Sequence, residues 1–504
     1  MLGKKNAVRL RRLLDVMIPI LITQTAIMAM NFCDSAMSGH AGAVHLAGTA
    51  IGGNLWMPVM ASLNGILLGS MPIIAHLLGR GERQNIGRVV RHTMLLATAF
   101  SLLLLVAGVL FLDRLLGTFG LEPQVHYIAK MYIAAIGVGV LPFFLSTALR
   151  ALVDTSGYTG ITMKIYLLAL PVNAFLNYCL IFCKFGAPAL GGIGAGLATG
   201  ITYWLEFFIF VWVVHKLPAF APLRIFTGKF KFDMAQLREN LSLGVPMGMA
   251  IFMEASIFGV IAIFIAKFGT VIIAAHQAAM SFTSLLYMVP LSFSMSLTIV
   301  VGVEAGARRF GEALRYSLLG IACNITVAVL LTIFVLFDRE FIAGLYTSEP
   351  VIIRQTIGFL FYAMFFQVMD ATAAPIQGIL RGYKDVKATF WAGLAAYWLI
   401  ENWDVVGPYF GKAWDWICGK FKWAADFIKG IVDWVFNAVD TIAKKWTESE
   451  TFKRNTADAL NMNFGGWQGS TAEEGAAWVR TGNEKGKESL ESPPDFVGPK
   501  PQDK

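Results

Sequence analysis

Residues 93–112 read TMLLATAFSLLLLVAGVLFL and carry no charged side chain. An α-helix needs about 20 consecutive, predominantly apolar residues to cross a hydrocarbon core of about 30 Å. This stretch therefore predicts a helix that spans a membrane. Nine other stretches meet the same criterion, so the sequence predicts ten spans: 13–37, 51–79, 93–112, 127–149, 161–183, 193–215, 241–267, 278–303, 316–337 and 356–380.

The composition of the whole chain also indicates a membrane protein that inserts into a lipid bilayer. Of its 504 residues, 56% are hydrophobic and only 15% are charged, and the mean hydropathy of +0.61 is far above that of an ordinary soluble domain. The net charge of +8 does not indicate nucleic-acid binding, because membrane proteins collect Lys and Arg in their cytoplasmic loops. We expect no enzyme activity, no nucleic-acid partner and no cofactor, since no group of residues has the spacing of a catalytic or metal site.

The basic residues alternate between the two sides of the predicted membrane. If the N-terminus lies in the cytoplasm, every strongly basic segment lies there too, whereas the opposite loops lack Lys and Arg or balance them with acids. This asymmetry is the positive-inside rule, and it predicts a cytoplasmic N-terminus. The predicted cytoplasmic segments are 1–12, 80–92, 216–240, 304–315 and 381–387.

A weak internal repeat predicts two halves of six helices each. Gly79, which follows the second span, corresponds to Gly306, and the Gly-Tyr pair at 157 corresponds to the pair at 382. The two offsets agree within two residues. Because many transporters are built from such repeats, we expect two six-helix bundles in a pseudo-twofold arrangement.

The composition changes abruptly near residue 400. Beyond it charged residues arrive every few positions, and each would cost about 2.5–3.5 kcal/mol in the middle of a span. The eleventh span would therefore comprise only 388–400, about 20 Å of helix, and the twelfth is missing. Apolar residues then recur every three or four positions over 412–446, which predicts an amphipathic helix that packs on a helical partner or lies on a surface. The final residues are polar and rich in Gly, Glu, Lys and Pro, which is typical of a disordered tail.

These observations predict an all-α membrane protein whose second bundle is truncated and followed by an amphipathic helix and a disordered tail. The truncation leads to the hypothesis that the chain is a fusion of a transporter with an unrelated segment. The expected domains are an N-lobe of six spans (1–215), a cytoplasmic inter-lobe linker (216–240), a C-lobe of four full spans and a partial fifth (241–400), the amphipathic segment (401–446) and the tail (447–504).

Acidic residues inside the predicted spans are the strongest indication of function. A carboxylate in hydrocarbon is costly unless it binds a cation, is protonated or faces a water-filled cavity. Asp34 lies in the first span, Glu254 in the seventh and Asp370 in the tenth, and Glu206 in the sixth is a fourth such acid. Because they occur in both halves, they favour a cation pathway over isolated structural acids.

Four segments carry a resemblance to a known family: ILITQTAIMAMNFCDSAMSGHAG (20–42), LALPVNAFLNY (168–178), GVPMGMAIFMEASIFGV (244–260) and VMDATAAPIQGILRGYKDVKATFW (368–391). In their order, spacing and local residue sequence, they are similar to segments of the multidrug and toxic compound extrusion family, especially its NorM-like branch. The resemblance covers about residues 10–400. Residues 401–450 resemble, in composition only, the C-terminal segments of phage tail tape-measure proteins.

The family resemblance implies an antiporter in the bacterial inner membrane that exports small organic cations, drugs or metabolites, in exchange for sodium or protons. A carboxylate can be neutralised by any of these cations, so they compete and exchange becomes obligatory. The resemblance places Asp34 in the N-lobe cation site. It places Asn173 and Asn177 in the lining of the same cavity.

The same resemblance assigns roles in the C-lobe and in the first helix. Glu254 and Asp370 match the C-lobe acids associated with the coupling ion and the drug, and they would hold sodium if sodium is that ion. Pro19 matches a first-helix proline that can bend the helix as the site changes occupancy. An ordinary proline tolerated in a membrane helix is the alternative.

Two alternative functions stay open. A lipid-linked sugar flippase of the same superfamily would be expected to have a more cationic cavity, so the acids in both halves argue against it. A phage tail or membrane-perforating structural protein is supported only by residues after about 400. If the chain is a transporter, we expect the truncation of its last two helices to impair transport.

Overall fold

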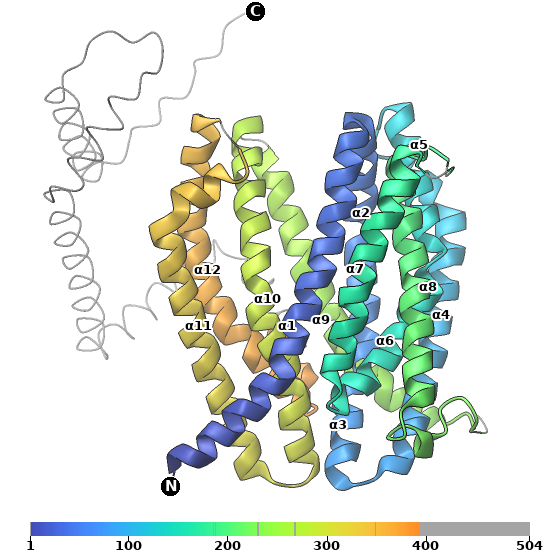
Figure 1. The fold of residues 1–504 in the computed structure, drawn as a ribbon, viewed down its shortest axis with the longest axis vertical. Helices are drawn as coiled ribbons and strands as arrows, with labels where there is room; N and C mark the ends of the chain where they lie inside the picture. The colour runs from blue at the N-terminus through green and yellow to red at the C-terminus, as the bar shows by residue number, and fades with distance from the viewer. Residues whose placement is uncertain are drawn as a thin grey trace, which may run out of the picture. The chain divides into compact units, whose positions relative to one another are not determined.

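The computed structural model of the chain describes residues 2–184, 186, 188–228, 231–266, 269–347 and 349–392. All the regular elements in these ranges are helical (Figure 1). The prediction of an all-α membrane protein is therefore confirmed. The predicted amphipathic segment 401–446, the tail 447–504 and positions 393–400 of the partial eleventh span lie outside the described residues.

The helices follow one another with short connections. A further helical stretch covers 386–392, where the described residues end. The second half begins with a helix that starts inside the predicted linker 216–240. The elements are α1 (Leu2–Ala41), α2 (Ala43–Leu68), α3 (Ser70–Arg80), α4 (Arg83–Gly117), α5 (Pro123–Gly137), α6 (Val140–Thr155), α7 (Thr159–Phe182), α8 (Gly192–Lys216), the 3₁₀ helix η1 (Ala221–Leu223), α9 (Met234–Ala266), α10 (Thr270–Gly306), α11 (Phe310–Gly344) and α12 (Pro350–Gly382).

Most of these helices are long and apolar enough to cross a membrane. Within the described residues there are eight such helices, counting α2 and α3 together, or nine if the bent pair α5 and α6 forms one span. Each of the ten predicted spans falls largely within helical segments of the structure. The helices extend past the predicted spans at several ends, because backbone hydrogen bonding continues a helix beyond the hydrocarbon.

Two predicted spans are broken where helices approach closely. Span 51–79 is interrupted at Gly69, and span 127–149 bends by 46° between α5 and α6. A Cβ atom on Gly69 would lie 2.5 Å from the Cα atom of Gly244, and one on Gly139 would lie 2.6 Å from the Cα atom of Gly200. The breaks therefore occur at glycines whose missing side chains let two backbones meet, as is common between membrane helices.

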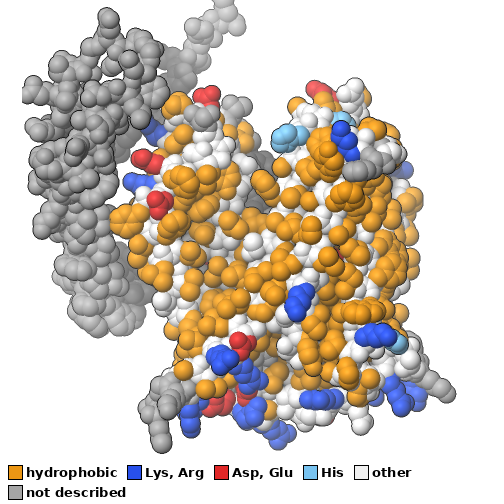
Figure 2. All heavy atoms as spheres, in the orientation of Figure 1, with side chains coloured by type: hydrophobic (Ala, Val, Ile, Leu, Met, Phe, Trp, Pro, Cys, Tyr) orange, Lys and Arg blue, Asp and Glu red, His pale blue; other side chains and the backbone are white. Residues whose placement is uncertain are grey.

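The face of the helical bundle shown in Figure 2 is covered with exposed apolar side chains. Val109 on α4 is 86% exposed and Phe337 on α11 is 71% exposed. Soluble monomers rarely expose contiguous apolar surfaces of this extent. A lipid environment accounts for these exposed apolar side chains, because they then contact hydrocarbon instead of water.

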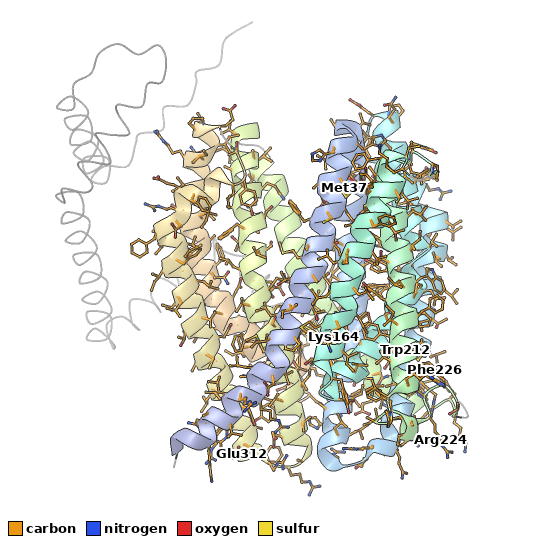
Figure 3. All side chains as sticks on the ribbon, in the orientation of Figure 1. Met37, Lys164, Trp212, Arg224, Phe226 and Glu312 are labelled. Atoms are coloured by element: carbon orange, nitrogen blue, oxygen red, sulfur yellow. The ribbon has the colours of Figure 1, made fainter. Side chains whose placement is uncertain are left out.

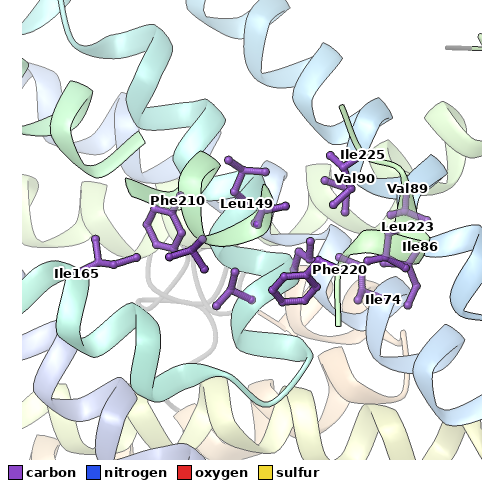
Figure 4. Close-up of a cluster of buried hydrophobic side chains, with 14 of the residues drawn as sticks. Ile74, Ile86, Val89, Val90, Leu149, Ile165, Phe210, Phe220, Leu223 and Ile225 are labelled. Carbon is purple, nitrogen blue, oxygen red and sulfur yellow. The ribbon is translucent and has the colours of Figure 1, made fainter. Parts of the chain in front are cut away.

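Buried apolar side chains, most of them from the first half, form one large cluster (Figure 4). Phe210 from α8 is fully buried, and Phe220 and Leu223 from the segment after α8 fold back onto Val90 of α4 and its neighbours. Each fully buried side chain of this size contributes about 1.5–3 kcal/mol when the alternative is water. The segment that links the two halves is thus anchored to the first half.

Lys and Arg gather at the end where α1 begins, which we call the basic end (Figure 2). Here Arg9 of α1 forms a two-pronged ion pair with Glu312 of α11, with N–O distances of 2.8 and 2.9 Å, and Figure 3 places Glu312 beside the start of α1. Gly79 of α3 lies against Gly306 and the carbonyl of Val303 in α10. The two halves are therefore in close contact at the basic end.

A second close approach lies within the second half, where α10 packs on α12. A Cβ atom on Gly378 would lie 2.1 Å from the carbonyl oxygen of Ser294. We expect Gly378→Ala to destabilise the protein by about 1–3 kcal/mol, because the two backbones must move apart. The melting temperature of the purified full chain in one detergent measures this loss.

Gly358 provides a matched control for that substitution. It lies in the same helix with nothing within 4 Å of the position of its Cβ atom. Gly358→Ala should leave the melting temperature unchanged or raise it, since alanine favours a helix over glycine by about 0.5–1 kcal/mol. Equal melting temperatures for the two variants would show that α10 and α12 are less closely packed than described.

Candidate functional site

Four polar side chains meet in the interior of the first half, and we call them the N-half cluster. Asp34 of α1 accepts a hydrogen bond from the Nδ2 atom of Asn177 at 2.5 Å and another from the Oγ1 atom of Thr199 at 2.7 Å. Asn177 also donates to the Oδ1 atom of Asn173 at 3.1 Å. Asp34 is only 7% exposed and the two asparagines are buried. The structure thus brings together three residues that the family resemblance implies at one site.

Helix geometry explains how this cluster forms. Asn173 and Asn177 are four residues apart in α7, so their side chains lie one above the other on one face. That face meets α1, which supplies Asp34, and α8, which supplies Thr199. Thr199 was not predicted, because a single threonine in the apolar run of α8 carries no signal of its own.

The chemistry of the N-half cluster suits a small cation. Its carboxylate, amide and hydroxyl oxygens are the donor atoms that hard cations prefer, and a proton could instead bind the carboxylate. The Oδ1 atom of Asn177 has no hydrogen-bond partner within the described part of the chain. No three His, Cys, Asp or Glu side chains come together among the described residues, so the cluster does not resemble a transition-metal site.

A second acidic group lies in the other half and is called the C-half pair, Glu254 of α9 and Asp370 of α12. Tyr287 of α10 donates a hydrogen bond to the Oε1 atom of Glu254 at 3.0 Å. Asp370 lies near enough to Glu254 for the two carboxyl groups to repel each other. Both acids are partly exposed, so a bound cation would relieve their repulsion. Tyr287 was also missed, because tyrosine is common in membrane helices.

Glu206 lies outside the N-half cluster. It is 1% exposed, and neither of its carboxyl oxygens has a hydrogen-bond partner in the described ranges. Arg150 and Tyr166 interact with it electrostatically. Glu206 therefore lies beside Arg150 and Tyr166 instead of the groups around Asp34.

Pro19 lies inside α1, which bends visibly in Figure 1. Proline removes one helix hydrogen bond and is the usual cause of a sharp kink. The hydroxyl of Thr23 donates to the carbonyl oxygen of Pro19 at 2.8 Å. The position therefore suits a bend in the helix that carries Asp34, although its role in transport stays a prediction.

Comparison with known proteins adds independent information. The sequence profile of the MatE family matches residues 19–179 and 246–402. The chain is 47% identical over 392 residues to the probable multidrug resistance protein NorM of Bacillus subtilis (strain 168), covering 78% of this chain and 87% of that protein. It is 45% identical over 411 residues to the protein of the same name from Bacillus licheniformis, covering 81% and 91%. The match to the MatE profile ends close to the change in composition near residue 400.

Solved structures with the same fold are also found. A eukaryotic MATE transporter, AtDTX14, superposes with a TM-score of 0.70 at 18% identity, covering 78% of this chain and 87% of that chain. An outward-facing multidrug resistance MATE family transporter of the MOP superfamily gives a TM-score of 0.70 at 18% identity, covering 76% and 84%. At this identity the likeness concerns the fold alone.

Proposed function

Since the chain belongs to the MatE family, we propose that it exports small organic cations, drugs or metabolites, from the bacterial cell in exchange for sodium ions or protons. The family consists of membrane transporters, so the chain is a transporter and not an enzyme. The multidrug resistance named for its relatives supports the choice of substrate. The predicted family resemblance is confirmed by the same matches.

The observation that carries this proposal is the buried N-half cluster. Asp34 is nearly inaccessible, and among the described residues its two carboxyl oxygens accept hydrogen bonds from neutral donors, Asn177 and Thr199. A carboxylate in such a place is stable when a cation or proton neutralises it. Uptake and release of that cation would then change the free energy of the conformations of the first half, which is what coupling requires.

Alternating access is the proposed mechanism, with the basic end in the cytoplasm. The positive-inside rule supports that orientation. At the basic end the Arg9–Glu312 pair and the contact of Gly79 with Gly306 join the halves, whereas Figure 2 shows a hollow between the halves at the opposite end. We infer that this conformation is closed to the cytoplasm and that the halves rock about their contacts.

The predicted repeat supports this picture. Gly79 and Gly306 are equivalent positions in it, and they touch each other. A residue meets its own equivalent only near the axis that relates two halves. The flippase and the phage structural protein are less favoured, because relatives at 45–47% identity are named as multidrug resistance proteins.

Transport by the full-length chain in proteoliposomes tests the proposal. We expect a cationic dye to move against its gradient when a sodium or proton gradient of opposite direction is imposed, and an ionophore that collapses the gradient should stop it. Because impaired transport is also predicted, the dye should in addition raise the melting temperature of the purified protein. If the dye neither moves nor binds under either gradient, the proposed function is wrong.

A further inference from the structure

A cavity of about 150 Å³ lies at the basic end, away from both acidic groups. Residues from α3, α4, the start of α9 and the turn after α12 line it. Its volume corresponds to roughly five water molecules at about 30 Å³ each. A compact polar group therefore fits, whereas a drug-sized molecule does not, since drug sites are about 300–1,000 Å³.

The lining of this cavity carries excess positive charge. Arg80, Arg88 and Lys384 line it together with one acid, Glu239. Lys384 and Glu239 form an ion pair with an N–O distance of 2.7 Å, so their charges compensate each other. The two arginines are left to attract an anion.

Neither arginine is strongly engaged elsewhere. Arg88 approaches Asp233 only at 3.4 Å, and both side chains are partly exposed; strong charge-assisted hydrogen bonds measure about 2.7–2.9 Å. For Arg80 the structure gives no hydrogen bond or ion pair with another described residue. Two guanidinium groups on neighbouring helices thus line a small cavity, and they have N–H donors available for a ligand.

The cavity also joins the two halves of the protein. Arg80 and Arg88 belong to the first half, and Lys384 follows the last described long helix of the second half. Beside it the Nε2 atom of His76 donates to the carbonyl oxygen of Gly382 at 2.8 Å, since a carbonyl can only accept. A ligand here would contact segments that must separate if the basic end opens.

We propose that this cavity binds a phosphate-bearing anion, held by Arg80 and Arg88, and that the bound anion stabilises the conformation closed at the basic end. Guanidinium groups match phosphate oxygens in pairs. Basic pockets between membrane helices on the cytoplasmic side accept anionic lipid headgroups, and a soluble phosphate offers the same chemistry. The site is separate from the transport site, and its binding of an anion does not depend on the proposed substrate, whereas its effect on the closed conformation rests on the proposed alternating access.

Binding to the purified full chain in a neutral detergent tests this site, with two probes measured by calorimetry. One probe is short-chain phosphatidylglycerol, compared with short-chain phosphatidylcholine, and the other is inorganic phosphate. Arg80→Gln should weaken binding of the effective probe about tenfold or more, because it removes charged hydrogen bonds to phosphate. Arg83→Gln is the matched control: Arg83 lies in the same exposed basic segment but does not line the cavity.

Each outcome of this experiment is decisive. Binding of phosphatidylglycerol alone identifies a lipid headgroup site, and binding of inorganic phosphate identifies a site for soluble phosphates. The melting temperature should rise with the effective probe in the wild type and in Arg83→Gln, but not in Arg80→Gln. If neither probe binds, or if both variants lose binding equally, the cavity is not a phosphate site.

Discussion

Asp34→Asn is expected to abolish cation-driven efflux while leaving the protein folded. An asparagine can still accept the hydrogen bond from Asn177 and can donate to the oxygen of Thr199, so the network of 2.5 and 2.7 Å contacts has a neutral replacement. The negative charge is lost, however. A bare charge deep in a membrane costs about 2.5–3.5 kcal/mol, which corresponds to about a 100-fold loss of cation affinity.

Efflux of a cationic dye and the effect of sodium or of pH on the melting temperature measure this prediction. Asp15→Asn is the matched control, because Asp15 lies in the same helix but is exposed, and it should behave as the wild type. Wild-type efflux and an unchanged cation response in Asp34→Asn would remove Asp34 from the coupling site. Failure of Asp34→Asn to fold would not support the site. The melting curve without added cation is therefore measured first, to show that the variant is folded.

The second large effect is expected for Asp370→Asn, which should lower the affinity for the drug. Asp370 and Glu254 form the C-half pair, and each carboxyl raises the electrostatic cost of the other. A cationic drug relieves that repulsion, so removing one charge should lower drug affinity by at least about tenfold. Tyr287→Phe removes only the 3.0 Å hydrogen bond to Glu254 and should have a smaller effect, about fivefold.

The dye-induced shift in melting temperature separates this prediction from the first. It should disappear in Asp370→Asn and persist in Asp34→Asn, whereas the shift induced by the coupling cation should be reduced in Asp34→Asn. Asp338→Asn serves as the control in the same half, since Asp338 is exposed on α11. An intact dye shift in Asp370→Asn would place the drug elsewhere in the protein.

Some of the candidate site could be predicted from the sequence and some could not. Asp34 stands out in any reading, because a lone acid in an apolar run has a large energetic cost. The resemblance to the family placed Asn173 and Asn177 beside it, and the structure brings the three together. Thr199 and Tyr287 are ordinary in their sequence surroundings, and only the packing of α8 and α10 against their neighbours reveals them.

The sequence by itself determined the helical membrane class and the apolar stretches that form its long helices, because the cost of placing charge in hydrocarbon depends on local composition. Only the tertiary structure decided which helices touch. The backbones meet where glycines from distant segments coincide, as Gly79 does with Gly306 and Gly378 with Ser294. Such contacts depend on how well two helix surfaces fit each other. The same holds for Arg80 and Arg88, which line one cavity only because their helices are neighbours. No local pattern in either segment specifies that fit.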